Sequence, residues 1–208
     1  MGTEQQVGAL DRAWGPVRAA GAIGAAGIGD LLAHASGYVT DRWQRTEPLI
    51  VDVGCGAGVP GLLLALVLPK SRLVLVDSSL RRCEMARAAA QAAGVLDRVE
   101  VRHCRVEAVA REAGARGGFD GAVVRSFGPP PEVAECALPL LRTGGSLVAA
   151  VSTGSLEAWC GADLSPLGSV VGSSWSTTAG RYLEVWRVGP SEERFPRGPA
   201  ARRGRPLF

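Results

Sequence analysis

The sequence has few aromatic residues, two histidines and a single lysine, Lys70, among its 23 basic residues. Phe, Trp and Tyr make up 5% of the 208 residues, which argues against a base-stacking platform such as an RNA-recognition sheet. The longest apolar run, Leu62 to Leu68, is far too short to cross a bilayer. Met1 to Gln6 lack the basic and then apolar pattern of a signal peptide. We therefore expect a cytoplasmic protein that does not enter a membrane.

The five cysteines form no ligand or disulfide pattern. Their number is odd and no C-x-x-C pair is present, so neither a disulfide framework nor a cysteine-based zinc site is expected. We expect reduced thiols and no bound metal, with Cys55, inside a glycine-rich segment, as the candidate for oxidation. The thiols are Cys55, Cys83, Cys104, Cys136 and Cys160.

The composition is that of one folded α/β domain with a modest appendage. Apolar residues make up 47% of the chain, which is enough for a substantial core at this length. Charged residues make up 21%, and 23 basic against 20 acidic residues leave a net charge of +3. This balance excludes a disordered chain and a uniformly basic nucleic-acid coat.

From about residue 48 onward, short apolar strands alternate with helical segments. This pattern is typical of a parallel sheet with crossover helices. The expected strands are residues 49–53, 73–77, 99–103, 119–124 and 147–151, followed by strand candidates at 169–175 and 182–188. The two late strands predict a hairpin whose last strand inserts antiparallel. The expected fold is therefore α/β and Rossmann-like, with a mostly parallel twisted sheet and a late antiparallel strand.

Three segments follow from this pattern. Residues 48–190 form the main domain, in which Pro139 predicts a kink or break in the helix that contains it. Residues 1–47 form a helical annex packed on the sheet. Residues 191–208 form a basic tail, which has no acidic residue after Arg194 and contains three prolines. We expect this tail to be extended.

The glycine-rich segment after the first strand is the strongest chemical signal in the chain. Glycines at a strand-to-helix turn permit positive φ and allow a ligand to approach backbone amides. The segment from Gly56 to Gly61 fits G-x-G-x-x-G, so a nicotinamide cofactor must be considered. Glycines that serve only a tight turn are a further alternative.

Two carboxylates favour a different ligand. Asp52 lies just before Gly54, where its charge suits a cationic amino-acid group better than a pyrophosphate. Asp77 ends the second strand and is placed to accept hydrogen bonds from a ribose. Together these features favour a site for S-adenosylmethionine.

Four motifs in order resemble those of the bacterial RsmG (GidB) methyltransferases. They are Asp52-x-Gly54-x-Gly56-x-Gly58-x-Pro60-Gly61, Asp77-Ser78-x-x-x-Arg82, Arg105-Val106-Glu107 and Arg125-Ser126-Phe127. Phe195-Pro196-Arg197 is similar to the family's aromatic-Pro-Arg ending. The resemblance covers roughly residues 48–208. It implies a class I S-adenosylmethionine-dependent fold and methylation of N7 of a guanosine in the 530 loop of 16S rRNA.

The resemblance also implies a cofactor site. Its residues would be Asp52, Gly54, Gly56, Gly58, Val59, Asp77, Val106, Glu107 and Arg125. Gly54 and Val59 would contact the cofactor's amino-acid end, and Asp77 its ribose. Val106 and Glu107 would hold the adenine, largely through the backbone.

Arg125 would lie beside both cofactor and substrate, as a candidate for positioning the substrate. No catalytic residue is assigned. Guanine N7 is already a bare lone pair, so its attack on a methyl group needs no general base, which suits a chain whose histidines are only His34 and His103. An alternative interpretation remains for three of these residues. Arg105 and Arg125 could form ordinary surface ion pairs, and Glu107 could be a solvated carboxylate in the first turn of a helix.

The implied partner is 16S rRNA or the small ribosomal subunit, bound by a monomer. Phosphate contacts are expected from the tail arginines Arg194, Arg197, Arg202, Arg203 and Arg205, with a solvated tail as the alternative. The family's Asn-Leu-Thr segment is absent, and Thr153-Gly154 stands where Lys-Gly is common. These departures keep two alternatives open: a small-molecule methyltransferase, and a non-catalytic cofactor-binding module.

Overall fold

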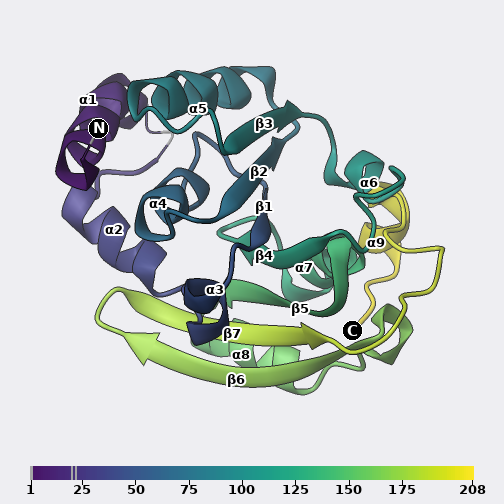
Figure 1. Ribbon diagram of the computed structural model, residues 1–208. Helices are drawn as coiled ribbons and strands as arrows, with labels where there is room; N and C mark the ends of the chain where they lie inside the picture. Colours follow the sequence, from purple (N-terminus) through teal and green to yellow (C-terminus); the bar gives the residue numbers. More distant parts are fainter. Residues whose placement is uncertain (1, 20, 22) are drawn as a thin grey trace.

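A seven-stranded sheet runs through the centre of the computed structural model, which describes residues 2–19, 21 and 23–208 (Figure 1). The strand order is β3-β2-β1-β4-β5-β7-β6. The strands are β1 (Leu49–Val53), β2 (Arg72–Asp77), β3 (Val99–His103), β4 (Phe119–Val124), β5 (Leu141–Ala150), β6 (Ser169–Thr177) and β7 (Gly180–Arg187). Strands β1 to β5 pair in parallel, and β7 is antiparallel to both β5 and β6. The expected α/β fold with a late antiparallel strand is confirmed.

Helices cover both faces of the sheet. They are α1 (Thr3–Ala19), α2 (Ile28–Ser36), α3 (Asp41–Arg45), α4 (Gly61–Val67), α5 (Leu80–Ala92), α6 (Val106–Val109), α7 (Pro130–Ala137), α8 (Thr153–Cys160) and α9 (Pro199–Gly204). One core cluster packs α1, α2, α4 and α5 against the sheet, and a second packs α6, α7 and α8 on the opposite face. Figure 1 shows the first group on one side of the strands and α6, α7 and α9 on the other. Among the described helices, none is long and apolar enough to cross a membrane.

Local sequence explains where the helices near the glycine segment begin and end. The expected helix near residues 60–68 is α4, whose residues from Leu62 to Leu66 are all buried, as its apolar sequence requires. Helix α5 begins after Ser79, whose side chain accepts a hydrogen bond from the amide of Arg82. The break expected at Pro139 is also present, because α7 gives way to a short 3₁₀ helix, Leu138–Leu140.

The N-terminal annex contributes to the main core instead of standing apart from it. Leu10 and Trp14 of α1 are fully buried in the same cluster as the β1 and α4 side chains. The indole Nε1 of Trp14 donates a 3.0 Å hydrogen bond to the carbonyl oxygen of Ala57, in the glycine segment. Residues 1, 20 and 22 of the annex lie outside the described residues. Helix α1 thus packs against the glycine segment through Trp14.

The C-terminal segment, residues 191–208, is not the extended tail that its prolines and arginines suggested. It folds back to form α9, and Phe195 is buried in the second core cluster. The guanidinium of Arg197 pairs with the buried carboxylate of Glu135 on α7. A carboxylate without a partner would be costly inside the protein, so the tail folds where it supplies the missing cation.

Candidate functional site

A cavity opens at the carboxyl end of the parallel strands. Strand β1 lies between β2 and β4, so the direction of strand succession reverses beside it. Ligands of open α/β sheets bind at such a switch point. The cavity has a volume of about 420 Å³. Of the cofactor-site residues expected from the sequence, those that line it are Gly54, Gly56, Val59, Asp77, Val106, Glu107 and Arg125.

Three glycines with positive φ shape the loop beneath this cavity, and only one of them faces open space. The φ angles of Gly54, Gly56 and Gly58 are +73°, +56° and +98°. A Cβ atom on Gly54 would lie 2.5 Å from the ring of Phe127, and one on Gly58 would lie 2.5 Å from Leu62. At Gly56 a Cβ atom would meet nothing within 4 Å. Gly56 therefore leaves open space beside the loop backbone, whereas Gly54, which also lines the cavity, and Gly58 leave no room for a side chain.

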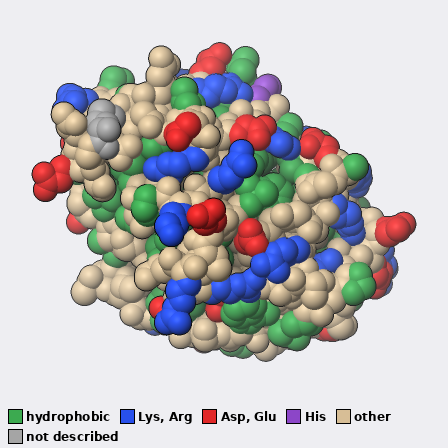
Figure 2. Space-filling model, viewed as in Figure 1, with side chains coloured by type: hydrophobic (Ala, Val, Ile, Leu, Met, Phe, Trp, Pro, Cys, Tyr) green, Lys and Arg blue, Asp and Glu red, His purple; other side chains and the backbone are tan. Residues whose placement is uncertain are grey.

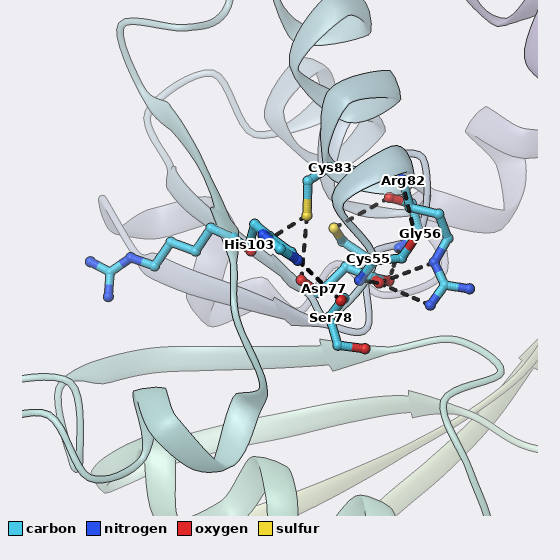
Figure 3. Close-up of polar contacts among 9 residues, drawn as sticks. Cys55, Gly56, Asp77, Ser78, Arg82, Cys83 and His103 are labelled. Carbon is cyan, nitrogen blue, oxygen red and sulfur yellow. Dashed lines mark hydrogen bonds and ion pairs between the residues drawn. The ribbon is translucent and has the colours of Figure 1, made fainter.

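The carboxylate of Asp77 connects this loop to the end of β2 (Figure 3). Its Oδ2 accepts a 3.0 Å hydrogen bond from the amide of Gly56. Its Oδ1 accepts from the amide of Ser79 at 2.9 Å and from the guanidinium of Arg82 at 2.9 and 3.0 Å. Since a carboxylate oxygen has two lone pairs, Oδ2 can accept one more donor, such as a ribose hydroxyl.

Two further contacts in Figure 3 fix the end of β2. The thiol of Cys83 lies 3.3 Å from the carbonyl oxygen of Asp77. The Nε2 atom of His103 lies 3.2 Å from the carbonyl oxygen of Ser78. His103 is exposed and serves here as a backbone contact, outside the cavity lining.

Asp52 lies behind the glycine loop and does not line the cavity. It is fully buried, and its Oδ2 accepts a 2.8 Å hydrogen bond from the amide of Gly61. Its Oδ1 is buried with no hydrogen-bond partner among the described residues. Burial raises the pKa of Asp52 to about 7, against the lowering effects of the Gly61 amide and the Arg125 charge. The Oδ1 atom is therefore an acceptor that the described residues leave unsatisfied, at a place that does not line the cavity.

Glu107 and Arg202 form part of the cavity wall. The Glu107 side chain is 10% exposed, and its Oε1 accepts a 2.6 Å hydrogen bond from Nη2 of Arg202. Burial alone would raise the pKa of Glu107, but the hydrogen bond from Arg202 and the nearby Arg105 charge hold it below the usual value. Glu107 is therefore ionised near neutral pH, and it is not the solvated carboxylate of the alternative interpretation.

Arg125 is half-buried where β4 ends, on the same cavity. The next residue, Ser126, has a φ of +53°, a left-handed conformation that costs a non-glycine residue about 1 kcal/mol. Such strain is common where a backbone is shaped for a ligand. Burial and then the charge of Arg125 lower the pKa of His34, so this imidazole is neutral. Tyr38 anchors the strand end by donating a 3.0 Å hydrogen bond to the Val124 carbonyl oxygen.

The cavity is also lined by residues that the sequence did not assign to the cofactor site, among them Ile23, Arg82, Cys104 and Arg202. The Asp77-Ser78-x-x-x-Arg82 motif could have identified Arg82, because the residue five positions after Asp77 faces back toward it across the helix start. No local signal identifies the others. Cys55 lines the cavity too, but burial raises its pKa, so it is a protonated thiol and a poor candidate for oxidation.

The tail arginines divide into two groups. Arg202 is 5% exposed and pairs with Glu107 and Glu132, and Arg197 pairs with Glu135, so these two guanidinium groups hold carboxylates of the protein itself. This corrects their expected role as phosphate contacts. Arg194, Arg203 and Arg205 are exposed. Figure 2 shows basic side chains interleaved with acidic ones on the displayed face, so any RNA contact there would come from individual arginines.

The fold and the site together identify the structural class of the protein. A mostly parallel sheet of this order, with a glycine loop after β1 and a carboxylate ending β2, is that of Rossmann-like S-adenosylmethionine-dependent methyltransferases. An O-methyltransferase from Bacillus cereus, solved in complex with SAH, superposes with a TM-score of 0.61 at 16% identity, covering 86% of this chain and 90% of that one. The 16S rRNA (adenine(1408)-N(1))-methyltransferase of Catenulisporales acidiphilia superposes with a TM-score of 0.54 at 18% identity, covering 76% and 93%.

The sequence then narrows the class to one family. The family model GidB, described as rRNA small subunit methyltransferase G, matches residues 30–161, which is more than half of the chain, and the chain belongs to this family. Ribosomal RNA small subunit methyltransferase G of Rubrobacter xylanophilus is 44% identical over 105 residues, covering 50% of this chain and 40% of that protein. The protein of the same name from Synechococcus sp. (strain WH7803) is 45% identical over 95 residues, covering 46% and 37%. The chain thus matches less than half the length of these curated relatives.

Proposed function

We propose that this protein binds S-adenosylmethionine in the cavity beside the glycine loop and methylates N7 of a guanosine in the 530 loop of 16S rRNA. The observation that carries the proposal is the convergence of Gly56, Asp77, Glu107 and Arg125 on one cavity at the switch point of the sheet. Membership of the family named for rRNA small subunit methyltransferase G supports the substrate class.

The residues present fit the cofactor. Gly56 leaves room against its backbone, and the buried Asp52, which does not line the cavity, would favour a cationic ammonium group through its charge and not by direct contact. Asp77 retains capacity for a ribose hydroxyl through Oδ2, and Val106 and Glu107 provide a buried wall for the adenine. When bound, S-adenosylmethionine supplies a methyl group activated by a sulfonium.

Methyl transfer by in-line displacement requires alignment more than acid–base chemistry. Guanine N7 carries a free lone pair, so no side chain has to remove a proton. This requirement agrees with a cavity whose lining, among the described residues, contains no histidine. Arg125 and the strained Ser126 are on the cavity rim, where Arg125 orients the base through its O6 edge or an adjacent phosphate.

With this substrate, the protein acts in the cytoplasm. Its macromolecular partner is the small ribosomal subunit or the rRNA of that subunit, and the chain acts as a monomer. Exposed Arg194, Arg203 and Arg205 supply phosphate contacts.

The test is transfer of a labelled methyl group from S-adenosylmethionine to undermethylated small subunits and to their deproteinised rRNA, read by nucleoside mass spectrometry. We expect label in 7-methylguanosine. Label in a different nucleoside would contradict the target atom. No label in either RNA, with cofactor binding intact and a metabolite pool methylated instead, would replace the proposal with a small-molecule methyltransferase. Cofactor binding with no methylated product at all would favour a non-catalytic module.

A further inference from the structure

We propose that Arg202, on the C-terminal helix α9, is a positioning residue for the adenosine end of the cofactor, because it fixes the carboxylate of Glu107 in the cavity wall. This inference rests on the proposed function and adds to it a residue far from the four sequence motifs. It also gives the folded tail a role in cofactor binding that is separate from RNA contact.

Two contacts of Arg202 are directed at the cavity, and a third, from Nη1 to the carbonyl oxygen of Arg197, lies within the tail. Its Nη2 donates to Oε1 of Glu107 at 2.6 Å and to Oε1 of Glu132 at 3.1 Å. All three side chains line the cavity, and the side chain of Arg202 is only 5% exposed. One guanidinium therefore joins the carboxylates of α6 and α7 across the site.

The burial of the Arg202 and Glu107 side chains constrains how the two groups can be paired. Removing charges from water is costly, and good geometry with several hydrogen bonds is needed to offset it. The Nε of Arg202 is buried without a partner among the described residues, so the arginine is not placed where its own hydrogen bonding is best satisfied. Its position is instead the one that fixes Glu107, whose second oxygen, Oε2, lies 3.6 Å from Nε of Arg105.

The tail does not depend on Arg202 for its attachment. Arg116 donates to the carbonyl oxygen of Phe195 at 2.7 Å and to Oγ of Ser191 at 3.0 Å. Arg111 donates to the carbonyl oxygen of Pro196 at 2.9 Å. Since the tail has these anchors upstream of α9, substitution of Arg202 should leave it docked and change mainly the cavity wall.

The experiment measures binding of S-adenosylhomocysteine by calorimetry, together with KM and kcat in the rRNA assay. Loss of a charge-assisted hydrogen bond predicts about tenfold weaker binding for Arg202→Ala, with KM for the methyl donor raised and kcat retained. Arg202→Lys keeps the charge without the planar guanidinium and should bind with intermediate affinity. Arg203→Ala removes the neighbouring exposed charge of α9 and should keep wild-type cofactor affinity.

A double-mutant cycle separates positioning from a merely structural role. In a Glu107→Gln background, Arg202→Ala should cause little further loss, because its effect passes through Glu107. Arg197→Ala, which breaks a tail ion pair outside the cavity, should weaken binding much less than Arg202→Ala. Equal losses in these two variants, or fully additive losses in the cycle, would overturn the inference.

The outcomes also separate this inference from the proposed function. Wild-type affinity in both Arg202→Ala and Arg202→Lys overturns the role of Arg202 and leaves the cofactor site standing. If Arg202→Ala fails to fold by circular dichroism, Arg202→Lys and the Glu107 background carry the comparison. A wild-type protein that binds neither S-adenosylhomocysteine nor S-adenosylmethionine overturns the cofactor site itself.

Discussion

The carboxylate of Asp77 accepts a 3.0 Å hydrogen bond from the backbone amide of Gly56, and so joins the end of β2 to the glycine loop after β1. The same carboxylate holds the start of α5 through Ser79 and Arg82. One side chain therefore holds the loop backbone and the start of the neighbouring helix, and also provides an acceptor for the ligand. The shape of the site therefore depends on the charge of Asp77.

Asp77→Asn should weaken binding of S-adenosylhomocysteine by about tenfold or more, because it replaces a charged acceptor with a neutral amide at three contacts. Asn is close in size to Asp, so the fold should be retained. Isothermal calorimetry measures the effect. Asp97→Asn, at an exposed carboxylate outside this cavity, is the matched control. Equal affinities of the two variants would contradict the assignment.

Gly56→Val should abolish cofactor binding, because its side chain would enter the open space that a ligand needs beside the loop. Gly114→Val is a control for backbone strain: Gly114 also has a positive φ, +85°, and a Cβ atom there would meet nothing within 4 Å. Gly114 lies outside the cofactor cavity. Thermal melts should show similar destabilisation of both variants, and binding should distinguish them. Retained binding in Gly56→Val would rule out this cavity as the cofactor site.

Asp52 should make the stability of the ligand-free protein depend on pH. Its pKa is raised from 3.8 to about 7, so the folded protein holds this proton more tightly than the unfolded chain does. Unfolding then releases a proton between these values, and the stability contribution of Asp52 falls as pH rises through the window. Asn at this position cannot titrate, and it can still accept the hydrogen bond from the Gly61 amide.

Urea unfolding of wild type and Asp52→Asn, repeated from about pH 4 to about pH 8, measures this effect. The difference in unfolding free energy should move in favour of the variant by up to about 4 kcal/mol as pH rises. Most of the change should fall below pH 7. A difference that stays constant across the range would mean that Asp52 is ionised throughout.

The exposed tail arginines should contribute to the salt dependence of rRNA binding. Replacing Arg194, Arg203 and Arg205 together with alanine should reduce the slope of log affinity against log salt by about 0.7 for each true contact with single-stranded RNA. Deleting the whole tail is a poor test, because it also removes Arg202 from the cavity wall. The triple variant should keep wild-type affinity for S-adenosylhomocysteine.

A matched triple variant replaces Arg45, Lys70 and Arg72, which are exposed near the amino ends of β1 and β2, at the opposite edge of the sheet. This variant should leave the salt slope unchanged. If both triple variants change the slope equally, the tail is not a specific RNA contact and only net charge matters.

The sequence was sufficient to predict the elements whose signal is local. Four apolar strands, the late hairpin and the break at Pro139 appear where periodicity and proline chemistry place them, whereas the fifth strand, expected at residues 147–151, already begins at Leu141. The glycine loop was also predictable, because a strand followed by closely spaced glycines leaves few backbone options. Arg82 could have been found by the same kind of local reasoning, from its spacing to Asp77.

The tail was mispredicted because its structure depends on distant residues. Prolines and arginines in residues 194–208 indicated an extended chain, whereas the carboxylates that retain Arg197 and Arg202 belong to α6 and α7. No periodicity within the tail reports a buried partner so far away in the sequence. The support of the glycine loop by Trp14 is a relationship of the same kind.

The central claim is that this cavity directs a methyl group to guanine N7 of 16S rRNA. Nucleoside mass spectrometry of 16S rRNA from a bacterial strain lacking its own 530-loop 7-methylguanosine, and expressing this chain, tests it most directly. We predict that 7-methylguanosine appears with the wild-type chain and not with Gly56→Val expressed at the same level. Absence of 7-methylguanosine with a folded, cofactor-binding wild-type chain, or its presence with Gly56→Val, would contradict the account.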